Sequence, residues 1–265
     1  MPDATVEVLF WLLVAGFPIA VFLSWAFELT PEGLKRESEV DRSRSTARKT
    51  GRRLNVVIIA VLLGVIGLLL LEHERSGKPL PLRMAEGTLE AMARGGIYDH
   101  VGGGFHRYAI DNDWLVPHFE KMLYDQAQLA RLYLSGWRLT GDPDLARVAR
   151  RTLDFVLRDL TSPEGGFYSA TDADSLNPEG EPQEGWFFTW TPAELREVLG
   201  DAATPALERY FGITERGNFE GRSILHLPNP ADEDLPEGLA RDRARLLEAR
   251  SHREEPFLDR KVLTG

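Results

Sequence analysis

The sequence predicts a mainly α-helical protein, a partial (α/α) toroid with a small β-hairpin that is preceded by two transmembrane helices. Two apolar runs near the N-terminus are each close to the ~20 residues that cross a bilayer. From residue 80 onward, apolar residues recur with the period of soluble helices. A Gly-Gly-Phe motif followed by two aspartates occurs at residues 103–113 and again at 165–174, as in folds that repeat a helical hairpin.

The two apolar runs, residues 8–27 and 54–71, contain no charged side chain. The segment between them is basic, with Lys35, Arg36 and further arginines, whereas no Lys or Arg precedes the first run. Because basic loops stay in the cytoplasm, we expect a membrane anchor over residues 1–78 with both ends outside, and a lipid bilayer as its partner. A cleaved signal peptide is the alternative for the first run, but it lacks a basic start and a cleavage site. The expected location is a bacterial inner membrane, with residues 79–265 outside the cytoplasm.

Composition excludes several classes of function. The chain has 265 residues, a net charge of −10 and no cysteine. Cysteine-ligated metals, disulfides and thiol chemistry are therefore excluded, and the acidic balance argues against a nucleic-acid partner. The segment after Asp172 has Leu176, Asn177 and Gln183 where an EF-hand calcium loop needs an oxygen ligand, a glycine and a bidentate glutamate. The glycine-rich loop lacks the Lys-Ser/Thr of a phosphate loop. We expect no metal and no cofactor.

Start and stop signals define the helices. Pro117 suits the first position of a long helix that Gly141 ends, and Asp142 with Pro143 begins the next, so the two should form a hairpin. Aromatic runs flank Asn177 and Gly180 and predict a small β-hairpin from residues 167–170 and 186–190. The expected helices are 82–93, 117–139, 143–160, 192–199, 205–210 and about 237–253.

A helix that begins at Pro117 would carry the first candidate catalytic groups. His118 and Glu120 would lie in its first turn, where the helix dipole favours a neutral imidazole and an ionised carboxylate. Asp125 would return to the side of His118, and Tyr124 would follow Glu120 by one turn. The alternative is a polar cluster that only holds the helix in register.

The loop before that helix is a candidate ligand site. His106 and Arg107 follow three glycines, which would let a ligand approach the backbone closely, and Tyr108 and Trp114 offer faces for a pyranose ring. The alternative is a tight turn that only places Phe105 in the core. Asp172 and Asp174 form a carboxylate pair whose separation from a partner carboxylate would decide between retaining and inverting hydrolysis.

Several segments resemble a known family. The stretches GGIYDHVGGGFHRYAIDNDWLVPHFEKMLYDQAQL, GGFYSATDADS, EGWFFTWTPAELREVLG, FGITERGNFEGRSILH and PFLDRKVLTG are similar to the thioredoxin-domain-containing family of spermatogenesis-associated protein 20 and its bacterial relatives. The resemblance implies a six-hairpin (α/α) toroid like those of N-acylglucosamine 2-epimerase and glycosidase-like barrels. The N-terminal part resembles the membrane module of bacterial tetratricopeptide and cyclase signalling proteins.

The chain departs from that family at both ends. The thioredoxin-like domain is missing, and the sequence stops at Gly265, where relatives continue into later hairpins. We therefore expect an incomplete toroid whose open apolar edge drives association.

Two functions follow. The first is a carbohydrate-active domain, a sugar epimerase, isomerase or glycoside hydrolase with a saccharide ligand; the second is a non-catalytic interaction domain, inactive because truncated. The expected catalytic residues are His106, His118, Glu120, Asp125, Asp172 and Asp174. The expected substrate-binding residues are Asp99, Arg107, Tyr108, Trp114, Lys121, Tyr124 and Trp190.

Overall fold

The computed structural model describes residues 27–30, 33–36, 47–229 and 236–262, with side chains from residue 59 onward. These ranges contain seven helices and small sheets, and about half of their residues are helical. The chain divides into two compact units, Met1–Leu68 and Leu69–Gly265. Every candidate site residue lies in the second unit.

The first unit contains a two-stranded antiparallel sheet and the start of a long helix. Strands β1 (Phe27–Thr30) and β2 (Gly33–Arg36) pair with Phe27 opposite Arg36. Helix α2 (Ala47–Ser76) begins here. Of the first predicted transmembrane run, residues 8–26 lie outside the described residues.

The prediction of two transmembrane helices is wrong for the described part of the chain, where no helix is both long and apolar enough to span a bilayer. The second predicted run, residues 54–71, lies within α2. Its described side chains are buried mainly along one stripe, whereas Leu71 is 60% exposed. One-sided burial is typical of a helix that packs one face against protein. Such a helix can contain a long apolar run without crossing a membrane. The buried stripe consists of Ile59, Leu63, Ile66 and Leu70.

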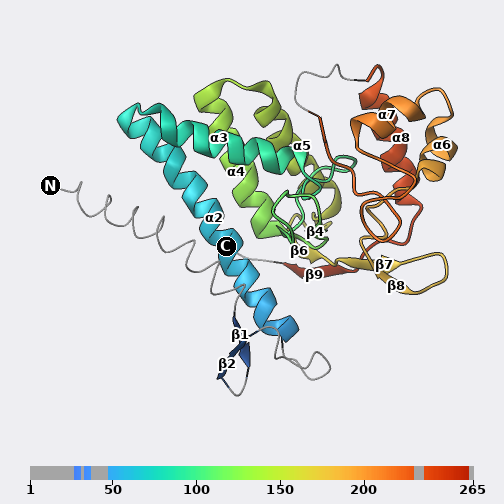
Figure 1. The fold of residues 1–265 in the computed structure, drawn as a ribbon, viewed down its shortest axis with the longest axis horizontal. Helices are drawn as coiled ribbons and strands as arrows, with labels where there is room; N and C mark the ends of the chain where they lie inside the picture. Colours follow the sequence, from blue (N-terminus) through green and yellow to red (C-terminus); the bar gives the residue numbers. More distant parts are fainter. Residues whose placement is uncertain (1–26, 31–32, 37–46, 230–235, 263–265) are drawn as a thin grey trace. The chain divides into compact units, whose positions relative to one another are not determined.

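Three helices pack together at the start of the second unit (Figure 1). Helix α3 (Pro79–Arg94) has a proline in its first turn and buries residues one turn apart, including Ala85 and Leu89. Helix α4 (Leu123–Thr140) ends at Gly141, whose φ of 77° is left-handed. Helix α5 (Pro143–Asp159) begins at Asp142, whose side chain accepts a hydrogen bond from the N–H of Asp144. The predicted hairpin of α4 and α5 is confirmed.

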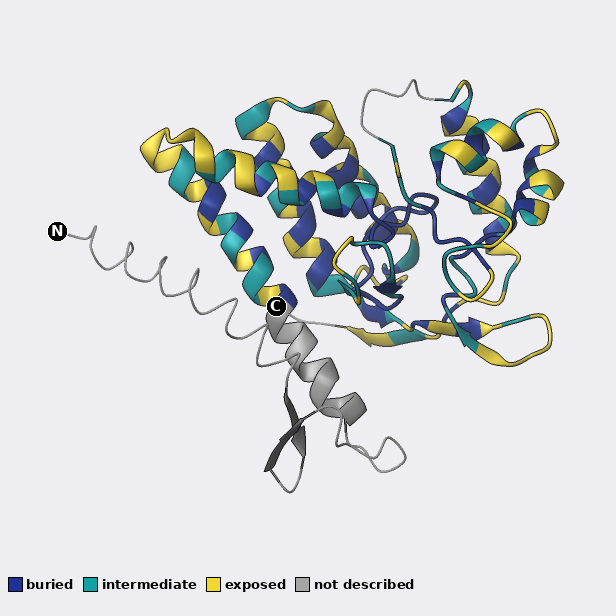
Figure 2. Cartoon of the chain, in the orientation of Figure 1, coloured by how far each residue is buried: buried dark blue, intermediate teal, exposed yellow. Residues whose placement is uncertain are grey.

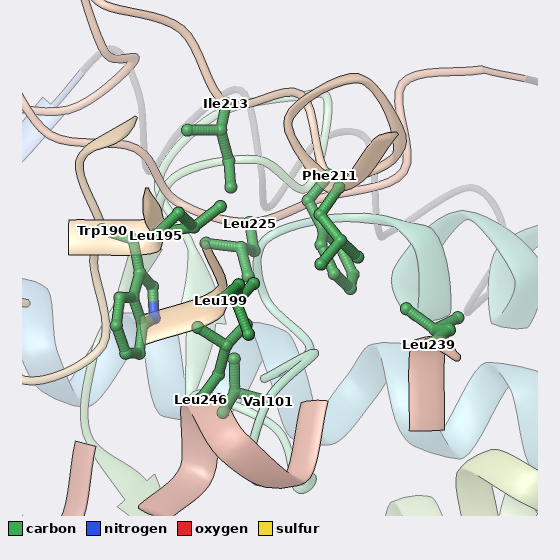
Figure 3. Packing of buried hydrophobic residues seen from close by; sticks show 10 residues of the cluster. Val101, Trp190, Leu195, Leu199, Phe211, Ile213, Leu225, Leu239 and Leu246 are labelled. Atoms are coloured by element: carbon green, nitrogen blue, oxygen red, sulfur yellow. The ribbon is translucent and has the colours of Figure 1, made fainter. Parts of the chain in front are cut away.

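Three shorter helices form a second core, shown in Figure 3. Helix α6 (Pro192–Leu199) starts with a capping box of Thr191 and Glu194. Helices α7 (Thr204–Tyr210) and α8 (Leu239–Ser251) follow it. The buried members of this core are Val101, Trp190, Leu195, Leu199, Leu207, Phe211, Ile213, Leu225, Leu239 and Leu246.

The strands of the second unit are short and antiparallel. Strands β5 (Lys121–Met122), β6 (Tyr168–Thr171) and β9 (Leu258–Val262) form one sheet in that order. Strand β3 (Tyr108–Ala109) pairs with β4 (Pro117–His118). Strands β7 (Asp174–Leu176) and β8 (Pro182–Glu184) form a hairpin.

The predicted β-hairpin has its turn at Asn177, but the predicted strands are wrong. Residues 168–171 form β6, which pairs with β5 and β9, and the hairpin consists of β7 and β8. The side chain of Asn177 accepts hydrogen bonds from the N–H groups of Glu179 and Glu181, which closes the turn. The aromatic run at residues 186–190 lies beyond the second strand. Turn chemistry, and not aromatic content, fixes where these strands pair.

The predicted helix start at Pro117 is wrong, because residues 117–122 are extended and α4 begins at Leu123. His118 pairs with Tyr108, and Lys121 pairs with Thr171. These two ladders take up the backbone groups that a first helical turn would have used, so tertiary pairing overrides the local proline signal. His118 and Glu120 are therefore not at a helix N-terminus.

The predicted fold class is also corrected. It named a partial six-hairpin toroid behind two transmembrane helices, whereas the described residues are about half helical with small sheets and contain no spanning helix. The α6, α7 and α8 segments are only 8, 7 and 13 residues long. Much of the chain between the described helices is instead loop, and one such loop carries Asp99, His106 and Arg107.

Candidate functional site

The glycine-rich loop, residues 95–107, is buried at every position (Figure 2). Buried backbone groups need hydrogen-bond partners, and this loop obtains several of them from its own chain and from α4. The N–H of His106 donates to the carbonyl of Ile97 at 2.8 Å. The amide side chain of Gln126 both accepts from the N–H of Phe105 and donates to its carbonyl, at 2.8 and 2.7 Å. The loop is thus a fixed base for Arg107 and Tyr108.

Asp99 anchors this loop to α8 and β5. One of its carboxylate oxygens accepts from the backbone N–H groups of Val101 and Gly102 at 3.0 and 2.9 Å. Arg250 donates to both oxygens at 3.0 and 2.9 Å, and Nζ of Lys121 donates at 2.7 Å. Burial alone would raise the pKa of Asp99, but the two cations outweigh it and hold that pKa well below its usual value. Asp99 is therefore an ionised structural anchor.

The three glycines of the loop pack against protein atoms. A Cβ at Gly102 would lie 2.0 Å from a guanidinium nitrogen of Arg250 and 2.9 Å from the carboxylate of Asp99. A Cβ at Gly103 would lie 2.4 Å from the carbonyl oxygen of Arg151, and one at Gly104 would lie 2.6 Å from the Phe155 ring. The glycines allow close packing of the loop on its neighbours, which is the tight-turn alternative of the sequence analysis.

Gly102→Ala is expected to lower the free energy of unfolding by about 1–3 kcal/mol, because the new methyl group displaces Arg250 from Asp99. Gly87→Ala is the matched control, since nothing lies within 4 Å of its Cβ position in α3. That control should be neutral or stabilising by up to about 1 kcal/mol. Urea unfolding of both variants measures the difference, and equal stabilities would contradict the close approach.

The extended segment 117–122 separates two sets of polar side chains. Successive residues of an extended chain point to opposite sides. Phe119 and Lys121 are each 1% exposed and lie in the interior. His118 and Glu120 point the other way, toward Arg107 and Tyr108 on the neighbouring strand. One set therefore belongs to the Asp99 anchor, and the other forms the candidate site.

The candidate site, called here the His118 cluster, consists of Arg107, Tyr108, His118, Glu120 and Glu184. Nδ1 of His118 lies 2.6 Å from a carboxylate oxygen of Glu184, and Nε2 lies 3.4 Å from Glu120. Because an ionised carboxylate only accepts, Nδ1 carries the hydrogen. The imidazole stacks on the Tyr108 ring at 5.1 Å. The His118 side chain is 24% exposed, so a ligand can reach it.

Arg107 connects this cluster to the start of α4. Its guanidinium donates to Glu120 at 2.6 Å and to the Tyr124 hydroxyl at 3.1 Å. Its Nε has no hydrogen-bond partner among the described residues. The pair of Arg107 and Glu120 is almost fully buried, so removing either charge would leave the other uncompensated.

Asp125 is the unusual carboxyl group of the site. It lies in the first turn of α4, is 1% exposed, and neither of its oxygens has a hydrogen-bond partner among the described residues. Burial raises its pKa to about 7, although Arg107 opposes the shift. A carboxyl group with that pKa gains and loses a proton near neutral pH.

Two of the predicted site residues are enclosed. Nδ1 of His106 donates to the carbonyl of Phe119 at 2.9 Å, and burial lowers its pKa to about 3, so the imidazole is neutral. Its ring is flanked by Phe119 and Phe188. Nζ of Lys121 lies 4.2 Å above the Phe155 ring, and burial lowers its pKa to about 8. Both residues serve the interior side of the segment.

The remaining predicted residues lie apart from the His118 cluster, with one exception. Trp190 belongs to the second core, beneath the guanidinium of Arg253 at 4.0 Å, and Trp114 is half-buried at a turn with a φ of 61°. Asp172 is exposed, and its carboxylate accepts a hydrogen bond from the N–H of Ala173. Asp174, also exposed, is the exception, because it pairs with Glu184 across the β7–β8 hairpin.

Sequence reasoning missed Glu184 and Arg250. Glu184 reaches His118 across 66 residues of sequence, and Arg250 reaches Asp99 across 151. A signal for Arg250 exists, because it follows Leu239 and Leu246 on the inward stripe of α8. A signal for Glu184 would have required placing the strands on either side of the Asn177 turn correctly. Among the described residues, no group of three or more potential ligands is placed to hold a metal ion.

Comparison with known proteins places the chain near one family. No family model matches the sequence. Spermatogenesis-associated protein 20 of Homo sapiens is 40% identical over 213 residues, and that of Rattus norvegicus is 39% identical over the same length. Each alignment covers 69% of this chain and 27% of the relative. An uncharacterised protein of Caenorhabditis elegans is 34% identical over 223 residues, which cover 73% of this chain and 31% of that protein.

These similarities support the predicted resemblance to the family of spermatogenesis-associated protein 20. The chain spans less than a third of the length of the curated relatives it matches. The relatives named here are animal proteins, and no spanning helix is present among the described residues. The predicted bacterial inner-membrane location is therefore corrected, because neither finding supports it.

Proposed function

We propose that this relative of spermatogenesis-associated protein 20 carries an acid–base site for a small carbohydrate, centred on the His118 cluster. The observation that supports the proposal most strongly is the accessible imidazole held between the carboxylates of Glu184 and Glu120. A carboxylate that fixes one ring nitrogen leaves the other to exchange a proton with a ligand.

The reaction that fits is isomerisation or epimerisation at the carbon next to a sugar carbonyl. Nε2 of His118 takes the proton from that carbon, and the C–H electron pair becomes a carbon–carbon double bond. The carbonyl oxygen takes a proton from solvent and forms an enediol. Protonated His118 then returns a proton to carbon while one hydroxyl of the enediol loses its proton to solvent, which restores a carbonyl, so the net change needs no oxidant, reductant or second substrate.

Arg107 and Asp125 are assigned positioning roles. Arg107 holds Glu120 at 2.6 Å, and Glu120 faces Nε2 of His118. When Asp125 loses its proton, Arg107 faces a second carboxylate and its attraction to Glu120 is shared. Asp125 therefore acts on His118 through Arg107, with a change near neutral pH.

A neutral polyol suits the surroundings better than an anionic substrate. The exposed margin of the cluster carries Glu184 and, beside it, Asp174, so negative charge surrounds His118. Tyr108 supplies a half-buried aromatic ring next to the imidazole. Aromatic faces and carboxylate acceptors together recognise the C–H and O–H groups of a sugar.

The proposal is tested by proton exchange in D2O. A panel of aldoses, ketoses and N-acyl hexosamines is incubated with the protein, and NMR follows loss of the C–H signal next to the carbonyl. We expect exchange in at least one sugar and a loss of about 100-fold or more in His118→Gln. His252→Gln, at an exposed position after α8, is the matched control and should retain the rate.

Two outcomes would contradict this assignment. If no sugar exchanges with the unaltered protein, or if His118→Gln retains the rate, the His118 cluster is not an acid–base site. A sugar that raises the melting temperature without any exchange would favour the non-catalytic binding function instead.

A further inference from the structure

A second group of polar side chains lies outside the His118 cluster and is called here the Tyr98 cluster. It consists of Tyr98 in the glycine-rich loop, Arg151 on α5 and Arg243 on α8. Tyr98 is 2% exposed, and its hydroxyl has no hydrogen-bond partner among the described residues. The same holds for Nη1 of Arg151 and Nε of Arg243, both of which are buried atoms. Each of the three residues thus has a buried donor without an acceptor among the described residues.

Arg151 is fixed beside Tyr98 by the loop backbone. Its Nη2 donates to the carbonyls of His100 and Val101 at 3.1 and 2.8 Å, and its guanidinium carbon lies 6.0 Å from the Tyr98 ring. Nη1, on the same planar group, is left unused. Backbone carbonyls therefore orient the Arg151 guanidinium, and no Asp or Glu side chain is needed to do so.

Arg243 reaches the same place from α8. It lies one turn from Leu239 and from Leu246, both of which pack in the core that contains Phe211 (Figure 3). The Phe211 ring lies 5.7 Å from His100, and His100 lies 5.2 Å from Tyr98. Arg243 thus lies beside the inward stripe of α8, and its charge acts on the Tyr98 hydroxyl, where it opposes the rise in pKa that burial causes.

The positive charge of this cluster is not neutralised within the described residues. Neither Arg151 nor Arg243 forms an ion pair with a described Asp or Glu. Burial, together with the charge of Arg151, lowers the pKa of Arg243 to about 10. Burial raises the pKa of Tyr98, so its hydroxyl stays a donor. Buried cations without a counter-ion are costly, so an acceptor-rich anion would stabilise them.

We propose that the Tyr98 cluster binds a small oxyanion of the phosphate class, as free phosphate or as the phosphate group of a monoester. Guanidinium forks and a tyrosine hydroxyl supply donors only, which matches an ion with several acceptor oxygens and no donor in its dianionic form. A carboxylate would satisfy fewer of these donors. The site is separate from the sugar site and stands independently of it.

Inorganic phosphate is the probe that tests this site. Isothermal calorimetry and the melting temperature are measured in phosphate and in chloride of equal ionic strength. We expect saturable phosphate binding to the unaltered protein. In Tyr98→Phe the affinity should fall by about tenfold or more, because a hydrogen bond to a charged group is lost. This variant removes a hydroxyl that has no partner in the described part of the chain, so it should fold.

Arg243→Gln should abolish phosphate binding, whereas Arg131→Gln, at an exposed position of α4, should leave it unchanged. Glucose 6-phosphate beside glucose then distinguishes a phosphomonoester from the free ion. Binding that is equal in the unaltered protein and Tyr98→Phe would overturn the proposal, as would a melting temperature that responds equally to phosphate and chloride. Proton exchange by His118 is not needed for any of these results.

Discussion

Asp99→Asn is expected to lower the free energy of unfolding by about 3–5 kcal/mol, because it leaves Lys121 and Arg250 as buried cations without a counter-charge. The amide can still accept from the N–H groups of Val101 and Gly102, so the loss reports the charge and not the turn. The NH2 group of the new asparagine would also face the donor groups of Lys121 and Arg250, which cannot accept its hydrogens. Urea unfolding at neutral pH measures the change.

Asp113→Asn is the matched control for this prediction. Asp113 lies in an exposed turn of the same region, and its side chain holds none of the buried cations. It should change the free energy of unfolding by about 0.5 kcal/mol or less. If Asp99→Asn is as mild as the control, the loop is not anchored by the carboxylate, and the placement of Arg107 and Tyr108 needs another explanation.

Asp125→Asn is expected to stabilise the protein at pH 8 and to lose that advantage at pH 4. The pKa of Asp125 is raised from 3.8 to about 7 in the folded protein. Between these values the folded state binds the proton more tightly than the unfolded state, so the stability of the unaltered protein falls as the pH rises. Asparagine cannot ionise and escapes this loss. A difference of about three pKa units corresponds to on the order of 4 kcal/mol.

The measurement is the free energy of unfolding of both proteins at the two pH values. The change in their difference is the quantity of interest, because the packing of the amide cancels in it. Asp154→Asn, at an exposed position of α5, is the control and should show no such change. If Asp125→Asn is more stable at pH 8 but exchanges sugar protons more slowly, the Asp125 carboxyl lowers stability and serves function. An equal difference at both pH values would contradict the raised pKa.

Local chemistry made several helix boundaries predictable. Asp142 followed by Pro143, and Pro192 after Thr191, each place a side-chain acceptor and a pre-set φ at a helix start, and both helices begin there. Gly141 ends α4 with the left-handed conformation that its type favours. These signals act within one turn, so they can be read without knowing any distant partner.

Pro117 shows where such reasoning fails. Like Pro143 it pre-sets φ for a first helical position, but Val116 before it cannot cap a helix, and strands β3 and β6 pair with the segment. The predicted grouping of His118 with Asp125 on one helix face is therefore replaced by a different arrangement. Here the site groups are joined through Arg107, which sequence spacing did not reveal.

The predicted membrane helices failed for a related reason. An apolar run predicts that its side chains are shielded from water, but it does not show whether lipid or protein shields them. In the described part of α2, burial follows one stripe, while Leu68 and Leu71 remain exposed. Long-range partners such as Glu184 and Arg250 were equally hidden, because 66 and 151 residues separate them from the groups they bind.

Titration of the Asp125 carboxyl carbon by 13C NMR is the most direct test of a proton-exchanging site beside Arg107, with Asp125→Asn used to assign the signal. A midpoint at about pH 7 is predicted. A midpoint close to 3.8, the ordinary value for aspartate, would mean that the carboxyl is ionised throughout the neutral range and has no proton to exchange there.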